Sequence, residues 1–352
     1  MRSAQYSFSG GEVTPEFWGQ IADAKFQTGL AVCRNFRVLP HGPVQNRAGF
    51  EFVREVKDSA QPVRLLPFTY NSTQTMVVEM GAGYCRYHTQ GATILGGGGT
   101  PYETATPHAA ADLFGIRYTQ SADVVTLVST QYPPAELKRT APGGVFTMTY
   151  SPISFATSLV APTAISATAT VPTTHGTPIT HTYALTTVGA DGIEESPISS
   201  SVSCSNNLFD TGAYNTINFT PAAGAQRTNV YKSSNGLWAY IGQSGGSSFV
   251  DDNITPDTTR TPPISNDPFV GAGNYPSAVG YFSGRKWFAG TTNKPQGVWA
   301  TRSATERNLT YSIPLKDDDA IAVVLTARQA NTIRHILPVS DLLLLTSGAE
   351  WK

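Results

Sequence analysis

The sequence carries little charge for its length. Only 14% of its 352 residues are charged, and 24 Lys and Arg nearly balance 25 Asp and Glu, which leaves a net charge of -1. This balance excludes a generic basic nucleic-acid binder, whose affinity would come from releasing the counterions of phosphates. Disorder is excluded as well, because disordered chains combine low hydrophobicity with high net charge, whereas 40% of this chain is hydrophobic.

Cysteine, long apolar runs and catalytic motifs are also scarce. Three widely separated cysteines (Cys33, Cys85 and Cys204) are too few for a disulfide framework or a zinc site. No run of 18 apolar residues predicts a membrane span, and the first residues lack the apolar core of a signal peptide. No nucleophile lies in a recognisable catalytic motif. We therefore expect a reduced, soluble protein without a secretory signal, metal site, cofactor or catalytic residues.

Turn residues are abundant and spread along the whole chain. The sequence has 32 Gly and 24 Pro, and between them lie short apolar runs rich in Val, Thr, Tyr and Phe. This pattern predicts an all-β fold. We expect one helix over residues 15–27, with Thr14 as its N-cap and Pro15 at its first position. A second, weaker helix is expected over residues 320–329, where β-branched residues compete with it.

A triplet of short strands separated by two turns recurs four times. Its central strands begin at residues 76, 124, 286 and 342, and in the second copy the turn is expected at Pro133 and Pro134. Leaving out residues 161–265, whose composition differs, reduces the spacings to 48, 57 and 56 residues. Such spacing is typical of β-propeller blades with some loop growth. The pattern alone also fits unrelated antiparallel hairpins in a sandwich.

The inserted stretch, residues 161–265, has 3 basic and 7 acidic residues and is rich in Thr and Ser. It contains an alternating run at 181–188, a Val-Tyr-Lys run at 230–232 and a Phe-Val-Asp run at 249–251. With about 100 residues, it resembles a fibronectin type III-like β-sandwich. The core Trp expected near Phe219 is absent, so the assignment rests on the later strands.

Outside this insert, a set of short motifs resembles the tail proteins of short-tailed bacteriophages, specifically the tail nozzle or tail tubular protein B-like family. The motifs occur in the same order along the chain and cover most of residues 1–155 and 276–352. They are Phe8–Glu16, Ala24–Leu30, Cys33–Gly42, Asn46–Val53, Arg64–Phe68, Gln120–Asp123, Tyr132–Pro134, Leu137–Arg139, Arg285–Thr291, Pro295–Trp299, Asp318–Ile321 and Thr346–Trp351.

The resemblance implies a structural virion protein, not an enzyme. Members of the family form a hexameric ring that closes the distal end of the tail and lets DNA pass. The implied partners are further copies of the chain, the tail adaptor ring, the passing phage DNA and, through the insert, tail fibres or host surface glycans. The implied location is the virion tail, after synthesis in the host cytoplasm. Because family members usually run longer, we expect the natural chain to continue beyond Lys352.

Four domains and two candidate interface regions follow from these patterns. We expect an N-terminal docking region (1–60) with one helix, propeller-like blades (61–160), the inserted sandwich (161–265) and further blades (266–352). The candidate interface residues are basic or aromatic near the N-terminus and acidic near the C-terminus: Phe8, Arg34, Arg37, Arg47, Asp317, Asp318 and Asp319. The acidic run is expected to be a solvated or subunit-contacting loop, since it lacks the spacing of a calcium loop.

Two other classes of protein remain open from sequence. A glycan-binding or glycan-cleaving propeller with an accessory sandwich domain would need two facing carboxylates in the mouth of the propeller. With 25 acidic residues the sequence does not single out such a pair. A cytoplasmic scaffold built on a propeller would also fit the composition, but it would not explain the ordered tail-protein motifs.

Overall fold

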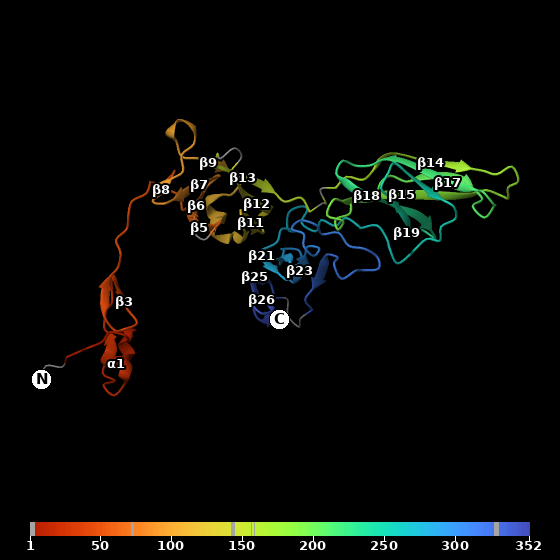
Figure 1. Cartoon of the computed structure of the whole chain (residues 1–352). Helices are drawn as coiled ribbons and strands as arrows, with labels where there is room; N and C mark the ends of the chain where they lie inside the picture. Colours follow the sequence, from red (N-terminus) through yellow and green to blue (C-terminus); the bar gives the residue numbers. More distant parts are fainter. Residues whose placement is uncertain (1–3, 72–73, 142–144, 156, 158, 327–330) are drawn as a thin grey trace. The chain divides into compact units, whose positions relative to one another are not determined.

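The computed structural model describes residues 4–71, 74–141, 145–155, 157, 159–326 and 331–352. Antiparallel sheets dominate it, so the predicted all-β fold class is confirmed. The chain forms two compact units, Met1–Glu55 and Val56–Lys352 (Figure 1). Within the described residues, no helix has the length and apolar character that crossing a membrane requires.

The first unit is built from short elements. A parallel pair joins β1 (Gly11–Glu12) to β2 (Gly29–Leu30), and a hairpin joins β3 (Phe36–Val38) to β4 (Val44–Asn46). The only buried residue that the structure describes in this unit is Gly42. The unit therefore has no apolar core of its own.

The one helix predicted for the N-terminal region is present, but its predicted extent over residues 15–27 is wrong. The segment instead forms a 3₁₀ turn, η1 (Pro15–Phe17), and a short helix, α1 (Ala24–Thr28). Gly19 separates them because its φ of +95° lies outside the helical region. Thr14 makes no side-chain cap, whereas the carboxylate of Asp23 accepts a hydrogen bond of 2.7 Å from the backbone N–H of Lys25 and starts α1.

The second unit contains four sheets formed by strands that follow one another in sequence, plus two sheets formed by the insert. The first two of the four, with their 3₁₀ turns, are made of β5 (Arg64–Thr69), β6 (Thr75–Gly81), β7 (Tyr84–Thr89), β8 (Ala92–Thr93), η2 (Gly97–Gly99) and β9 (Glu103–Ala105), then η3 (Ala110–Gly115), β10 (Arg117–Ser121), β11 (Val124–Ser129), β12 (Tyr132–Thr140) and β13 (Thr147–Pro152).

The turn predicted at Pro133 and Pro134 is wrong, because both residues lie inside β12. Between Leu127 and Ser129 the pairing of β11 with β12 shifts register, opposite these two prolines. Proline has no N–H to give to a ladder and is tolerated in a strand at such irregularities. The Pro134 carbonyl still accepts a hydrogen bond of 2.8 Å from the Ile153 N–H.

The remaining two sheets of this series come after the insert. They are made of β21 (Ala278–Phe282), β22 (Arg285–Ala289), β23 (Gly297–Ala300) and β24 (Ile321–Val324), then β25 (Ile333–Pro338), β26 (Leu342–Thr346) and β27 (Glu350–Trp351). The second helix, predicted over 320–329, is wrong for residues 321–324, which form β24. Ile321, Val323 and Val324 are β-branched and favour a strand. Residues 327–330 lie outside the described part of the chain.

Each of these four sheets shares apolar packing with the next. One core joins Phe68 and Met80 of the first sheet to Leu137 of the second. A second core places Val128 of the second sheet with Phe288 of the third, and a third core joins the third and fourth sheets. The four sheets therefore form a continuous series rather than separate hairpins.

The insert forms a two-layer sandwich. One sheet has the order β14-β17-β20 and the other β16-β15-β18-β19 (Figure 1). Side chains of both sheets, including Tyr183, Ile217 and Val230, meet in one core. The strands are β14 (Thr163–Thr170), β15 (Ile179–Gly189), β16 (Val202–Asn206), β17 (Tyr214–Thr220), β18 (Ala225–Ser234), β19 (Leu237–Ser244) and β20 (Ser248–Asp251).

Candidate functional site

The predicted acidic run, Asp317–Asp319, forms the turn before β24. Asp319 is buried, and its Oδ2 accepts hydrogen bonds of 2.8 Å from the Ser312 N–H and 3.0 Å from the Lys316 N–H. The carboxylate therefore holds the turn together from inside. Its geometry leaves no free oxygen pair facing solvent, so Asp319 does not present its charge to a partner.

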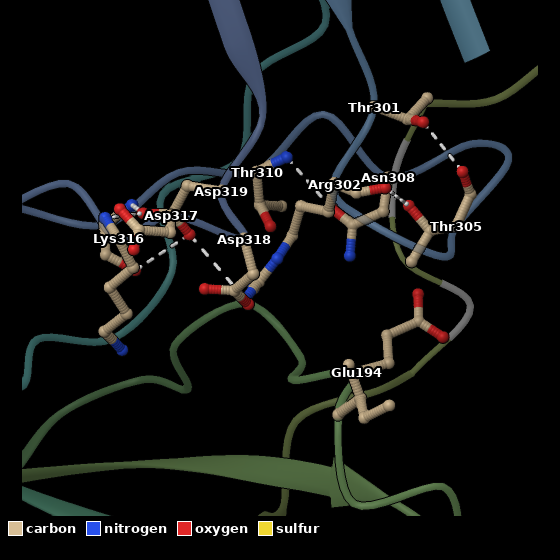
Figure 2. A network of polar contacts seen from close by, with 12 residues as sticks. Glu194, Thr301, Arg302, Thr305, Asn308, Thr310, Lys316, Asp317, Asp318 and Asp319 are labelled. Atoms are coloured by element: carbon tan, nitrogen blue, oxygen red, sulfur yellow. Dashed lines mark hydrogen bonds and ion pairs between the residues drawn. The ribbon is translucent and has the colours of Figure 1, made fainter. Parts of the chain in front are cut away.

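Two arginines hold the same turn, Arg285 from β22 and Arg302 from the segment after β23. Arg302 forms an ion pair with Asp318, and its guanidinium lies 3.6 Å from Asp319 Oδ1 (Figure 2). Arg285 donates to the backbone oxygens of Asp317, at 2.7 Å, and Asp319, at 2.6 Å. Partial burial opposes the ionisation of Asp318, but the hydrogen bond and charge of Arg302 outweigh it and lower the pKa of that carboxyl.

Only Asp317 of the acidic run directs a free carboxylate outward. It is exposed, and its carboxylate has no hydrogen bond or ion pair within the described residues. It borders a groove of about 490 Å³ that runs beside β24 and is lined mainly by apolar side chains. The lining includes Trp299, Tyr311, Leu315, Lys316, Asp317 and Val323.

Next to the turn, Asn308 and Thr310 are buried and each keeps one polar atom without a partner. The Asn308 Oδ1 accepts a hydrogen bond of 2.9 Å from the Thr310 N–H, while the Asn308 Nδ2 and the Thr310 Oγ1 remain unbonded (Figure 2). Within the described residues, no group of three or more His, Cys, Asp or Glu is placed to hold a metal ion. The hydrogen bonds and ion pairs around Asp317–Asp319 therefore hold this loop in place.

A buried ion-pair network joins the second and third sheets of the series. Lys286 on β22 is fully buried, and its Nζ lies 3.1 Å from Glu136 on β12 and 3.1 Å from Glu306. Arg307 forms a further ion pair with Glu136. Burial alone would raise the pKa of Glu136, but the charges of Lys286 and Arg307 lower it. Sequence reasoning missed this network because its partners lie 150 residues apart.

A second buried network ties the two layers of the sandwich. Asp251 accepts hydrogen bonds from the Tyr183 hydroxyl, at 2.7 Å, and from the Lys232 Nζ, at 2.8 Å. The Asn215 Nδ2 donates to the Tyr183 oxygen at 2.7 Å. Burial, followed by the contact with Asp251, raises the pKa of Tyr183. The Phe-Val-Asp run in the sequence was the signal for Asp251, although its partners could not be assigned.

The outer face of the first sheet carries a third polar cluster. The Glu79 carboxylate accepts a hydrogen bond of 2.7 Å from the Tyr84 hydroxyl and lies 3.1 Å from His88 Nε2. Burial and then Glu79 raise the pKa of Tyr84 to about 12. Beside it, Glu103 forms ion pairs with Lys57 and Arg86. The acids in this cluster are thus also bonded within the chain.

One buried histidine has no hydrogen-bond partner. His108 is 3% exposed, and neither ring nitrogen has a partner in the structure. Its ring meets the edges or faces of Tyr132 and Tyr150 at centroid distances of 4.8 and 5.5 Å. Burial lowers the pKa of this imidazole, and the nearby charge of Asp112 only partly opposes it. The side chain acts as an aromatic ring in the packing.

The basic part of the predicted interface lies in the first unit. Arg34, Arg37 and Arg47 are exposed, and Phe8 is half-buried. None of the three arginines has an ion-pair partner in the part of the chain that the structure describes. Arg47 lies over the ring of Phe50, with its Cζ 4.1 Å from the ring centroid. Their role at an interface stays a prediction.

Large apolar side chains gather on the surface of the same unit. Exposed fractions reach 95% for Tyr6, 87% for Phe50 and 77% for Phe52. An open hollow of about 740 Å³ lies among Val13, Trp18 and Phe26. The structure thus places the basic and acidic candidates in two different units, each beside exposed apolar surface.

Comparison with known proteins gives no further assignment. No protein-family model matches the chain, and no curated protein shows significant similarity to it.

Proposed function

We propose that this chain is a structural subunit of a short bacteriophage tail, which forms a hexameric nozzle ring at the distal end and a conduit for DNA ejection. The proposal rests on the ordered motifs of residues 1–155 and 276–352, which resemble the tail nozzle family. In this account the protein is not an enzyme, needs no cofactor and resides in the virion tail.

The observation that carries the proposal is the state of the first unit. Its 55 residues bury only Gly42 among those described, while aromatic side chains such as Phe50 and Phe52 are exposed. Isolated two-stranded pairs are marginal in water, and units of this size need a core or a partner. An assembly that covers these side chains supplies what the chain alone does not.

The remaining fold supports a structural role. We read the four consecutive sheets with shared cores as propeller-like blades, because their order and spacing match that architecture. We read the insert as a fibronectin type III-like module, since it packs two sheets over one core. In the ring, this module would project outward toward tail fibres or host surface glycans, and the adaptor ring would contact the N-terminal region.

The buried acids favour this function over glycan cleavage. Among the described residues the buried carboxylates are Glu79, Glu136, Asp251 and Asp319. Each carboxylate accepts a hydrogen bond from, or forms an ion pair with, another group of the same chain. A glycosidase needs one carboxylic acid and one carboxylate free to face the same bond. The near-neutral chain also suits a conduit, because a strongly basic lumen would bind the passing duplex.

Particle mass and shape test the proposal. The purified chain is measured by light scattering and negative-stain microscopy, first alone and then with a purified tail adaptor ring. We expect a ring with a central hole and about six times the 37.6 kDa chain mass in at least one sample. A stable monomer in both samples contradicts the proposal.

A further inference from the structure

The hairpin of the first unit presents unpaired cations beside exposed aromatic rings. We call residues 33–52, which contain β3 and β4, the arginine hairpin. Arg34, Arg37 and Arg47 are exposed and have no ion-pair partner among the described residues, and Phe36 and Phe50 beside them are exposed too. In the part of the chain that the structure describes, this sheet has two strands, so each of them has a free edge. A surface that is acidic and apolar and has a free strand edge would therefore complement the arginine hairpin.

An apolar groove with one exposed carboxylate lies beside β24. We call this hollow of about 490 Å³, lined by Trp299, Leu315, Lys316, Asp317 and Val323, the β24 groove. Leu315 and Val323 are exposed, and Asp317 holds an unpaired carboxylate at the rim. β24 ends its sheet, so one of its edges has no partner strand in the described part of the chain. A surface that offers a cation for Asp317, apolar side chains and a free strand edge would complement the β24 groove.

We propose that the arginine hairpin of one copy docks onto the β24 groove of a second copy. The inference rests on the proposed ring and names the contact that would build it. Apolar surface and free strand edges complement each other between the two surfaces, and the exposed Asp317 carboxylate offers an arginine an anion beside Lys316. The partner is a second copy of this chain, because each chain carries both the arginine hairpin and the β24 groove.

The contact has a defined chemistry. An arginine guanidinium meets the Asp317 carboxylate in a planar, two-bond ion pair. Asp318 and Asp319 are not available, because Arg302 and the turn backbone already bind them. The Phe36 and Phe50 rings cover Leu315 and Val323. Since the two docking surfaces differ, the contact is head-to-tail, and such contacts close into rings when the rotation between copies permits.

Thiol cross-linking in the full chain tests the inference. Cys33 lies beside Arg34 at the start of the hairpin and is partly exposed. The variant Lys316→Cys places a second thiol at the groove while keeping Asp317. Cys204→Ser removes a second native cysteine. The third, Cys85, stays in the chain, but burial raises its pKa to about 12, so its thiol is unreactive near neutral pH. With a short bismaleimide we expect covalent multimers up to the ring size.

Matched variants define the background. Asp252→Cys places the second thiol on an exposed turn of the sandwich instead, and we expect no multimers above background. Cys33→Ser in the Lys316→Cys chain removes the hairpin thiol and should abolish the ladder. Adding Asp317→Asn to the cross-linking chain should lower the multimer yield about five-fold, the effect of losing one surface ion pair of about 1 kcal/mol.

Mixing two differently marked chains separates contacts between copies from contacts within one. In one chain Cys33 is the only reactive thiol. The other chain carries Lys316→Cys together with Cys33→Ser, so that its reactive thiol lies at the groove. Covalent dimers of the two support docking between copies. A bridge found only within single chains carrying both thiols overturns it. Rings seen by negative-stain microscopy without any bridge overturn the docking but leave the ring proposal standing. Monomers without a bridge, both alone and with the adaptor ring, overturn both.

Discussion

The two compact units of the chain solve the problem of burying apolar side chains in opposite ways. The unit from residue 56 onward has four apolar cores, in which Phe68, Phe288 and Tyr183 are fully buried. The first unit buries only a glycine among its described residues and leaves Phe50 and Phe52 exposed. The difference shows that one region buries its apolar side chains by its own packing, and it underlies our proposal that a partner covers those of the other.

The largest contrast is expected from truncating one phenylalanine in each unit. Phe288→Ala removes a ring that packs against Phe155 and Phe269 at 5.2 Å, and should cost about 3–5 kcal/mol of the free energy of unfolding. Phe50→Ala should change it by less than about 0.5 kcal/mol. Urea unfolding followed by tryptophan fluorescence, to which Trp299 in the same core contributes, measures both. Equal losses would contradict the comparison.

A loss of similar or slightly smaller size is expected from the buried ion-pair network. Glu136→Ala leaves Lys286 buried without its fully enclosed partner, which should destabilise the chain by about 3–5 kcal/mol. The control is Glu306→Ala, because its side chain is 49% exposed and should cost less than about 1 kcal/mol. Thermal unfolding of both variants gives the answer, and similar melting points would show that the network does not join the two sheets.

The buried histidine gives a smaller, pH-dependent effect. Burial lowers the pKa of His108 below the value of about 6.5 that it has in the unfolded chain. The unfolded state therefore binds the proton more readily, so stability is full above about pH 6.5 and is lost as the pH falls through the folded pKa. His108→Phe should flatten this part of the curve of stability against pH. An unchanged slope between pH 7 and 5 would refute the assignment.

The smallest effect is expected from the helix cap in the first unit. Asp23→Ala removes the hydrogen bond to the Lys25 N–H and should weaken α1 by about 1 kcal/mol. Because none of the described residues of this unit belongs to the four apolar cores, the main unfolding transition should not move. Limited proteolysis within residues 1–55 should become faster instead. A shifted main transition would show that the two units are coupled.

Local patterns predicted much of this fold, and most of the errors have local causes. The strand triplets correctly located the centres of β6, β11, β22 and β26, because alternation and turn residues act within a few positions. The helix over 15–27 failed where Gly19 takes a positive φ and Asp23 caps a later start. The Pro133–Pro134 turn failed because a shift in register lets a strand hold both prolines.

The candidate site was harder to predict because it depends on contacts that are distant in sequence. The acidic run was visible, but nothing local distinguished the exposed Asp317 from the buried Asp319, which the Ser312 and Lys316 N–H groups bind. Lys286 and Glu136 gave no signal, since each lies in an ordinary strand until the sheets meet. The unpaired arginines of the hairpin were visible, and their clustering with aromatic residues remains the best signal for an interface.

Hydrogen exchange of residues 1–55, measured in dilute chain and in the assembled particle, tests the central claim most directly. The account predicts fast exchange of these residues in the monomer while the sheets of residues 56–352 stay protected, and strong protection of both units in the assembly. Protection of residues 1–55 in the monomer equal to that of the sheets would contradict the claim that a partner completes this unit.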